Sequence, residues 1–451
     1  MPSTNSRRRG LTLAATSLGF GVVQLDVSVV NVAIRPIGAA LGGDVGALQW
    51  VVNAYTVAFA ALILSAGALG DRIGAKRVFI AGFSVFTAAS AICGLAPSLG
   101  ILIGARALQG AGAALLVPCS LTVLSHTFPE PAERSRAIGR WAVGASAALS
   151  AGPLVGGVLT ATLGWRAIFF INAPIGLTGI LLTARYADET SRSPDRGVDL
   201  WGQLTAILCL TLLAAATIRG GSAGFGSTSV LAGYATAAGA GVAFLAVEGR
   251  RARPMLPLRL FHCEAFGANT AIGLLINVAF YGLIFVLSLF FQRAQHFSAL
   301  QAGLAFAPMT AAIMASNAVA GNLAQRVGTR AVIAGGALLM AGGTVTLEGI
   351  GAHTAFPALV AQLVAIGFGL GLIVPLMTAS LLGSVDRSRS GIAAGTLNTA
   401  RQAGSVIGVA LFGSLIAGGH IVGGLHVALA IAAVLSLVVA TIGAHTRTPE
   451  V

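Results

Sequence analysis

Charged residues are scarce in this chain of 451 residues. Only 9% of the residues are Asp, Glu, Lys or Arg, whereas 56% are hydrophobic, and the mean hydropathy is +0.88. No soluble fold has enough interior to bury so much apolar surface. The composition therefore excludes an ordinary soluble protein and indicates a membrane protein.

Lysine and cysteine are also rare. Lys76 is the only lysine and lies outside any glycine-rich phosphate loop, which excludes P-loop ATP hydrolysis as the energy source. The four cysteines show no paired spacing and the histidines form no cluster, so neither a disulfide framework nor a metal site is expected. A Gly-x-Ser-x-Gly string at 220–224 lacks the strand context of a hydrolase. We therefore expect no cofactor, no metal and no enzyme activity.

Long apolar segments dominate the chain instead. About 20 helical residues cross the hydrocarbon layer of a bilayer. Fourteen segments of that order remain when the chain is divided at its charged and turn-rich points, near 11–34, 46–66, 78–96, 100–123, 137–160, 166–184, 200–218, 227–247, 266–291, 300–321, 331–350, 355–382, 391–416 and 422–443. The sequence therefore predicts an all-α integral membrane protein with 14 transmembrane helices.

The basic residues lie mostly on one side of these predicted spans. With the N-terminus inside, 21 of the 27 basic residues lie in cytoplasmic segments. Four lie outside, namely Arg35, Arg166, Arg219 and Arg293, and two lie within spans, namely Arg106 and Arg401. Cytoplasmic loops retain positive charge, so both termini are predicted to be cytoplasmic. The net charge of +13 then needs no nucleic-acid partner. Residues 1–10 are polar and basic and lead directly into the first span, so no cleaved signal peptide is expected.

A short charged turn occurs twice. Residues 67–77 read Gly-x-x-Gly-Asp-Arg-x-Gly-x-Lys-Arg, and residues 321–331 carry a weaker copy with Gln325 in place of Asp71. The copies are farther apart than six spans require, so two spans are inserted between duplicated halves. We predict a cytoplasmic segment at 1–10, a six-helix bundle at 11–184, linkers and two inserted helices at 185–259, a second six-helix bundle at 260–443 and a cytoplasmic tail at 444–451. Such halves around a central cavity are typical of secondary carriers that alternate access.

Seven strings follow one another along the chain: Leu25–Ala33 with Pro36, Gln49–Tyr55, Gly67–Arg77, Arg106–Gly112, Gly152–Gly157, Trp165–Gly176 and Arg401–Gly404. In this order they resemble the fourteen-span drug:proton antiporters of the major facilitator superfamily, the multidrug and antiseptic efflux type. The resemblance covers nearly the whole chain. It implies the major facilitator fold, with two inserted central helices, and proton-coupled export. Ala148 stands where the antiporter motif of that family usually has glycine.

Asp26 is the only carboxylate that falls deep inside a predicted span. Acidic residues buried in a membrane are functional by default. With a rise of about 1.5 Å per residue, Arg106 lies at a similar depth and could meet Asp26 across spans one and four. We expect the two residues to couple proton and substrate binding, which would exclude each other at one site. A static ion pair between two helices is the alternative.

The charged turn is expected to act as a conformational gate. Its glycines allow a tight reversal, and Asp71 would cap the N-terminus of a neighbouring helix in one state. Opening the other side would break that contact, at a cost of about 1 to 2 kcal/mol. The alternative is an ordinary cytoplasmic loop that carries positive charge and has no gating role. The expected gate residues are Gly67, Gly70, Asp71, Arg72, Gly74, Lys76 and Arg77.

Other polar residues at membrane depth are candidates for the substrate cavity: Asn31, Asn53, Tyr55, Gln109, Asn398, Arg401 and Gln402. Arg401 lies too deep in its span to reach water easily, so it should face protein or a cavity. Interhelical hydrogen bonding is the alternative for each residue. The ninth span offers an apolar wall, of which about half is expected to face lipid, made of Phe280, Tyr281, Phe285, Phe290 and Phe291.

Small residues recur at every fourth position of span five, at 144, 148, 152 and 156. They form a smooth groove in which a neighbouring helix packs closely, and an adjacent proline loosens the backbone ladder. We expect a seal or pivot between the halves, with ordinary helix packing as the alternative. The antiporter-motif residues are Gly144, Gly152, Pro153, Gly156 and Gly157.

The sequence thus predicts a monomeric carrier in the cytoplasmic membrane of a bacterium that exports small amphipathic compounds or drugs against protons. Its partners would be the small-molecule substrate, protons and the lipid bilayer. A dedicated exporter of one metabolite or antibiotic, and a membrane receptor or enzyme, are the alternatives. Two buried arginines against one buried aspartate leave the cavity without spare negative charge, so neutral or anionic cargo fits as well as the cations that the resemblance implies.

Overall fold

A computed structural model describes residues 4–190, 199–251, 254, 256, 258–385, 390–417 and 420–446. Within these ranges the chain is helical and contains no strand. The helices are α1 Thr4–Leu41, α2 Val45–Ile73, α3 Ala75–Leu95, α4 Leu99–Thr127, α5 Pro131–Leu163, α6 Ala167–Phe170, α7 Asn172–Tyr186, α8 Leu200–Ala223, α9 Thr228–Arg250, η1 Leu258–His262, α10 Glu264–Leu289, η2 Phe290–Ala294, α11 Ala299–Ala305, α12 Ala307–Val327, α13 Thr329–Thr346, η3 Leu347–Gly349, α14 Pro357–Gly383, α15 Ser390–Ile416 and α16 Ile421–His445.

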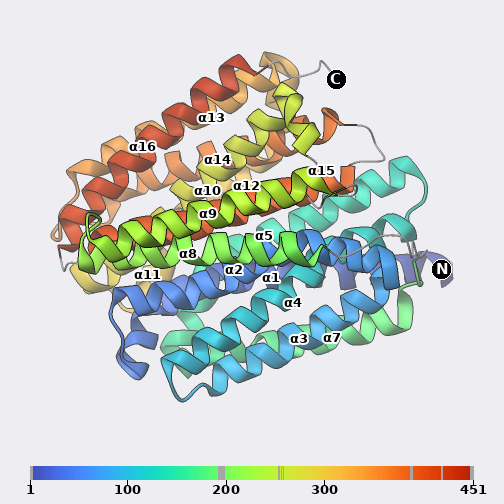
Figure 1. The fold of residues 1–451 in the computed structure, drawn as a ribbon, viewed down its shortest axis with the longest axis horizontal. Coiled ribbons are helices and arrows are strands. Elements are labelled where there is room, and N and C mark those ends of the chain that lie inside the picture. The colour runs from blue at the N-terminus through green and yellow to red at the C-terminus, as the bar shows by residue number, and fades with distance from the viewer. Residues whose placement is uncertain are drawn as a thin grey trace.

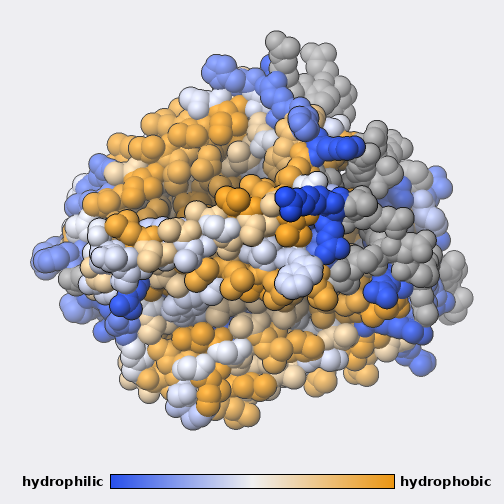
Figure 2. Space-filling view, viewed as in Figure 1, coloured by the Kyte–Doolittle hydropathy of each residue, from blue (hydrophilic) through white to orange (hydrophobic). Residues whose placement is uncertain are grey.

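The predicted number of membrane spans is confirmed. Among the described residues, 14 helical segments are long and apolar enough to cross a membrane. Two of these spans are interrupted, because α6 is followed by α7 and α11 by α12 with a short break in each. The outside of the molecule shows a wide apolar belt between hydrophilic ends, as expected for a surface that faces lipid (Figure 2).

The first helix begins earlier than the apolar pattern predicts. Helix α1 starts at Thr4, inside the segment expected to precede the first span. Its first turns are basic and find acidic partners, since Arg8 forms an ion pair with Asp188 and Arg9 forms one of 3.1 Å with Glu133. These contacts hold the polar end of the helix against the segment after α7 and against the first turn of α5, in its own bundle.

Two bundles lie side by side and enclose the middle of the molecule (Figure 1). Helices of the first half occupy the lower part of that view and helices of the second half the upper part, with both termini at one end. Helix α2 packs against α15, and α5 packs against α11 and α12, so these pairs form the seam between the bundles. Sliding or rocking along such a seam is how related architectures change access.

The two inserted helices lie across the front of this seam in Figure 1. Helix α8 packs on both α2 and α15, and α9 packs along α8. The side chain of Gln203 in α8 donates to the carbonyl oxygen of Ala61 at 2.6 Å and accepts from the hydroxyl of Ser65 at 2.5 Å. The insertion is therefore fastened to the first bundle by hydrogen bonds and covers the lipid side of the seam.

The internal duplication is visible in the backbone. The charged turn and its copy pass through Gly74, with φ +102°, and Gly328, with φ +89°, in a region that favours glycine. Close helix packing is repeated too, since a Cβ at Gly110 would collide with the carbonyl oxygen of Tyr55, and a Cβ at Gly367 with that of Met309. Both halves thus build the same crossing of their second and fourth helices.

The prediction that about half of the aromatic wall faces lipid is wrong. All five residues are buried: Phe280 at 6% exposure, Tyr281 at 7%, and Phe285, Phe290 and Phe291 at 0%. Helix α10 lies in the interior, in contact with α1, α14, α15 and α16, so no face of it remains for lipid. Its high hydropathy therefore reflects burial on all sides, which a single helix cannot reveal by its periodicity.

Candidate functional site

The two charged residues expected to meet do so. The Nη1 atom of Arg106 in α4 donates to the carboxylate of Asp26 in α1, and both side chains are at most 1% exposed. The same Nη1 donates to Oε1 of Gln109 at 2.8 Å, and Nε donates to the carbonyl oxygen of Val51 at 3.0 Å. The pair is thus held by three helices of the first bundle.

A network of amides completes the surroundings of the carboxylate. Its Oδ1 atom accepts hydrogen bonds from Gln109 at 2.8 Å and from Asn172 at 3.0 Å. Both amides also donate to Ser90, whose hydroxyl in turn donates to the carbonyl oxygen of Phe169. Sequence reasoning missed Ser90 and Asn172 as site residues. Asn172 belonged to a quoted motif at membrane depth, which was the available signal.

Tyr55 of α2 packs against this network. The guanidinium of Arg106 lies over its ring, 4.3 Å from the centroid. The phenol is fully buried, and its oxygen has no hydrogen-bond partner. Because α2 packs against α15, Tyr55 connects the buried charge pair to a helix of the interface between the bundles.

The expectation that proton and cargo compete directly for Asp26 does not fit this conformation. The carboxyl group is fully buried, and its hydrogen bonds come from side chains of its own bundle. It does not line the central cavity described next. Any coupling in this state has to pass through the side chains that surround Asp26, because a cargo molecule has no room to touch it.

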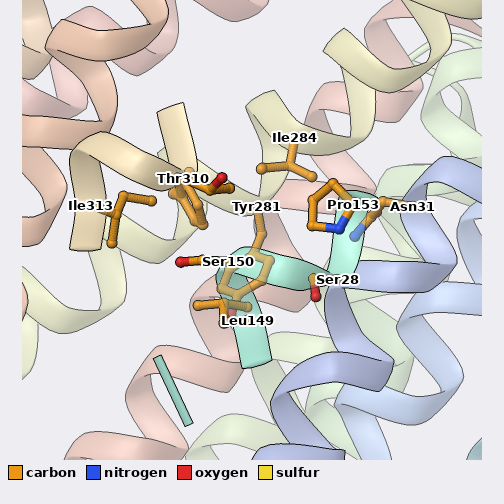
Figure 3. A pocket seen from close by; sticks show the side chains of 10 residues that line it. Ser28, Asn31, Leu149, Ser150, Pro153, Tyr281, Ile284, Thr310 and Ile313 are labelled. Atoms are coloured by element: carbon orange, nitrogen blue, oxygen red, sulfur yellow. The ribbon is translucent and has the colours of Figure 1, made fainter. Parts of the chain in front are cut away.

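A small cavity separates the bundles near their middle (Figure 3). Its volume is about 20 Å³, which is room for about one water molecule. Figure 3 shows Tyr281 reaching from α10 toward Leu149 and Ser150 of α5. The remaining lining residues are Ser28, Asn31, Pro153, Phe280, Ile284, Thr310 and Ile313. A drug-sized molecule requires the bundles to move apart.

The predicted cavity residues fall into two groups, one in the first bundle and one on α15 of the second bundle. In the first bundle, Gln109 belongs to the Asp26 network and does not line the cavity. Asn31 lines the cavity, and Asn53 is fully buried on α2 with both amide atoms unpartnered. The other group lies half-buried on α15 and comprises Asn398, Arg401 and Gln402.

Asn269 and Asn277 of α10 were not predicted as site residues, although they lie at four-residue intervals in line with Tyr281, which was predicted as part of the aromatic wall. Asn269, Asn277 and Tyr281 are buried, and Gly273 occupies the intervening position. A side chain on Gly273 would lie 3.4 Å from Cγ of Arg401. The spacing of four residues on one helix was the signal that could have identified this polar stripe.

Hydrogen bonds join the bundles at the end opposite the termini. The amide of Gln49 in α2 donates to the carbonyl oxygens of Val409 at 2.7 Å and Ala410 at 2.8 Å. Between α1 and α10, Ser288 donates to the carbonyl oxygen of Asn31 at 2.6 Å, and Gln292 donates to that of Val32 at 3.0 Å. This end of the seam is closed in the structure.

The basic part of the charged turn is bound to its own bundle. Lys76 donates to the carbonyl oxygens of Ala184 at 3.1 Å and Ala187 at 2.8 Å, at the C-terminus of α7. Arg77 forms an ion pair of 3.4 Å with Glu189. These contacts suit cations at a helix C-terminus. The capping role of Asp71 in another state stays a prediction.

The small residues of α5 pack against two different partners. A Cβ at Gly152 would collide with Ser28, and one at Gly156 would lie 2.8 Å from the carbonyl oxygen of Val29, both on α1. A Cβ at Gly157 would lie 2.9 Å from the carbonyl oxygen of Ala299 in α11. Gly144 has only ordinary contacts. The small residues of α5 thus allow close packing of α1 on one face and of α11, in the second bundle, on the other.

The sequence matches the family model of the Major Facilitator Superfamily over residues 16–260 and 270–450. The chain belongs to the Major Facilitator Superfamily. This membership confirms the predicted fold and the prediction of a multi-pass membrane transporter, and it places the chain among transporters rather than enzymes. A Major Facilitator protein of known structure, the human organic anion transporter MFSD10 (TETRAN), has a similar fold, with a TM-score of 0.68 and 16% identity over 96% of this chain and 99% of that one.

Several members of the superfamily are similar in sequence. The Methylenomycin A resistance protein of Streptomyces coelicolor is 36% identical over 404 residues, covering 90% of this chain and 85% of the relative. The Multidrug resistance protein Stp of Mycobacterium tuberculosis is 35% identical, covering 91% and 76%. The Cephamycin export protein CmcT of Amycolatopsis lactamdurans is 36% identical, covering 90% and 85%.

Proposed function

We propose that this protein is a proton-coupled antiporter that exports small amphipathic organic compounds across the cytoplasmic membrane of a bacterium. The relatives supply the direction of transport, since their names describe resistance to or export of antibiotics and drugs. The observation that carries proton coupling is the Asp26–Arg106 pair, the one buried carboxylate at membrane depth held against an arginine in the described part of the chain.

The chain's own residues suggest how protonation is transmitted. A proton on Asp26 removes the negative charge that faces Arg106. Arg106 then keeps its contacts with Val51, Gln109 and the ring of Tyr55 but loses its counterion. An unbalanced buried charge is costly, so the arginine and the helices that hold it favour another arrangement. Because Tyr55 lies on α2, a helix of the seam, the shift acts on the interface between the bundles.

This mechanism links proton and cargo through conformation rather than through a shared binding group. Protonation biases the seam toward one state and cargo binding biases it toward the other, so each weakens the other. The closed seam at Gln49 then represents one of the two states, in which the end opposite the termini is sealed.

Everted membrane vesicles with an imposed pH gradient, acidic inside, test the proposal. Methylenomycin A, a cephamycin and the dye ethidium serve as probes, and a pH-sensitive dye reports proton efflux. Addition of an exported compound should dissipate the gradient in vesicles that contain the protein, and not in vesicles that contain Asp26→Asn. Uptake of a probe that is unaffected by the gradient and by the variant would refute proton coupling.

A dedicated exporter of one compound is the second candidate. The names of two relatives favour it, because they describe resistance to or export of a single antibiotic or antibiotic class. Resistance of expressing cells to a single probe would support the dedicated exporter. Resistance to all three would support a multidrug pump.

A further inference from the structure

Arg401 is the second arginine in the interior of the membrane domain, and it lies on α15, a helix of the seam between the bundles. It lies near the middle of α15, a helix that packs against α2, α8, α10 and α16. Its aliphatic stem lies beside Gly273 of α10, a helix in the interior of the molecule. The side chain is therefore directed from α15 toward α10 and not toward lipid, although it does not line the small closed cavity.

The two interior arginines differ in what surrounds them. Arg106 has a carboxylate, a carbonyl oxygen, an amide oxygen and an aromatic ring. Arg401 forms neither an ion pair nor a hydrogen bond with any residue that the structure describes, and its buried Nε atom has no partner. Arg106 is therefore fully occupied by partners within its own bundle, whereas the N–H donors of Arg401 remain available for a ligand.

Charge balance gives the same result. Asp26 is the one carboxylate at membrane depth in the described chain, and Arg106 neutralises it. The positive charge of Arg401 on the seam helix α15 is therefore left without a compensating charge among the described residues. An unpaired charge at this depth is strongly unfavourable, so it persists where a ligand of opposite charge provides the balance during the working cycle.

Other unpartnered polar atoms lie on the same helices. Both amide atoms of Asn53 and the hydroxyls of Tyr55 and Ser405 are buried without a hydrogen bond. Gln49 of α2 is hydrogen-bonded to the backbone of Val409 and Ala410 in α15. Asn53 and Ser405 each lie about one helical turn farther into the membrane domain, so they are at the same level on the two helices. Buried polar groups are normally paired, so unpaired donors and acceptors around one seam point to a polar ligand.

We propose that Arg401 binds the carboxylate of an anionic cargo, so that the exported compounds are amphipathic organic acids. This inference rests on the proposed export function and names its substrate class. The planar guanidinium offers parallel N–H donors that match a carboxylate in a bidentate contact. The apolar part of the cargo then packs on the aromatic wall of α10, where Phe280 and Tyr281 line the cavity. Binding takes place in a state with the bundles farther apart.

Matched probes test the charge preference without requiring transport. The purified full-length protein in detergent is titrated with 2-naphthylacetate, 2-naphthylacetamide and 2-naphthylethylamine, which share an apolar body and carry a negative, a neutral and a positive head group. We expect the acid to bind at least tenfold more tightly than the amide and the amine. Equal affinity for the three probes, tighter binding of the amine, or no binding of the acid overturns the proposal.

Variants assign the preference to the residue. Arg401→Gln should reduce the preference for the acid to within about twofold, and Arg401→Lys should retain part of it. Thermal melting of each variant shows whether it is folded, and Arg401→Lys provides a folded comparison if Arg401→Gln is not. An unchanged preference in both variants refutes the assignment.

Asp26→Asn separates this inference from the proposed function. It should keep the acid preference, because Asp26 lies inside the first bundle away from the cavity, while proton-driven transport is lost. In the wild-type protein, proton-coupled transport without a preference for the acid would refute the anion site alone. A wild-type preference for the acid with transport that does not depend on the proton gradient would refute the coupling alone.

Discussion

The guanidinium carbon of Arg106 lies 4.3 Å from the centroid of the Tyr55 ring, so the buried ion pair and the seam between the bundles share one contact. Arg106 also holds Asp26, and Tyr55 lies within electrostatic range of Tyr281 in the other bundle. Because α2 packs against α15, the side chains around the carboxylate reach a helix of the seam. Under the proposed function, this contact is the route by which a proton on Asp26 would affect the position of the second bundle.

Substitutions of Tyr55 separate the roles of its ring and its hydroxyl. Tyr55→Phe keeps the surface under Arg106 and removes a hydroxyl without a hydrogen-bond partner, so stability should change by less than about 1 kcal/mol. Tyr55→Leu removes the ring and should cost about 2 kcal/mol or more. Unfolding in detergent measures both. We expect proton-coupled transport to survive in the first variant and fall in the second. Equal loss in both would show that the hydroxyl carries the coupling.

Removing the charge of Asp26 should destabilise the protein as well as abolish coupling. Asp26→Asn leaves Arg106 buried without a counterion, at a cost of about 3 to 5 kcal/mol. The double variant Asp26→Asn with Arg106→Gln should regain much of that stability without regaining proton-driven export. Chemical unfolding and vesicle transport measure the two effects separately. Full export by the single variant would reject the coupling role.

The hydrogen bonds of Gln49 should control opening at the end opposite the termini. Each of its two bonds to α15 contributes about 1 kcal/mol, so Gln49→Leu should favour opening by about tenfold or more. A cysteine reporter is introduced by Ser150→Cys, with Cys209 and Cys263 replaced by serine. It is labelled from outside the cell with a membrane-impermeant maleimide, and the labelling rate should rise by that factor in Gln49→Leu. Gln295→Leu is the control, because Gln295 bonds to Thr354 within the second bundle. Equal rates in the two variants would contradict the closing role of Gln49.

Two glycines of α5 should respond differently to the same added methyl group. At Gly156 a Cβ would lie 2.8 Å from the carbonyl oxygen of Val29, so Gly156→Ala should separate α1 from α5 and cost about 2 kcal/mol or more. At Gly144 the nearest atom is Cβ of Ser17 at 3.7 Å, so Gly144→Ala should be neutral within about 1 kcal/mol. Melting temperature and transport rate measure both. A tolerated Gly156→Ala would show that the groove has no sealing function.

An anionic cargo makes the exchange sensitive to the membrane potential. One proton entering while one organic anion leaves moves two positive charges inward, and each charge contributes about 2.3 kcal/mol per 100 mV. Exchange of a proton for a monovalent cation moves no net charge. In proteoliposomes without a pH gradient, a potassium potential set by valinomycin should therefore drive export of 2-naphthylacetate. A rate that does not depend on this potential would contradict anion export.

Local properties of the sequence were sufficient for the overall architecture. Hydropathy predicted the membrane spans, because the need to satisfy every backbone group in lipid permits only long apolar helices. The repeated turn predicted the duplication, which reappears in the left-handed backbone of Gly74 and Gly328. The meeting of Asp26 with Arg106 followed from their depths, because two opposite charges have few other partners inside a membrane.

The tertiary structure alone decided which side chains face one another. Ser90 and Asn172 join the Asp26 network because α3 and α7 converge there, and no spacing within one helix encodes that meeting. The aromatic residues of α10 turned inward because neighbours surround the whole helix. Asp26 and Arg401, both placed by sequence inside the membrane, differ in the same way, since packing encloses one in its bundle and leaves the other at the seam. Hydropathy is a property of each segment, whereas the direction of a side chain depends on which helices pack around it.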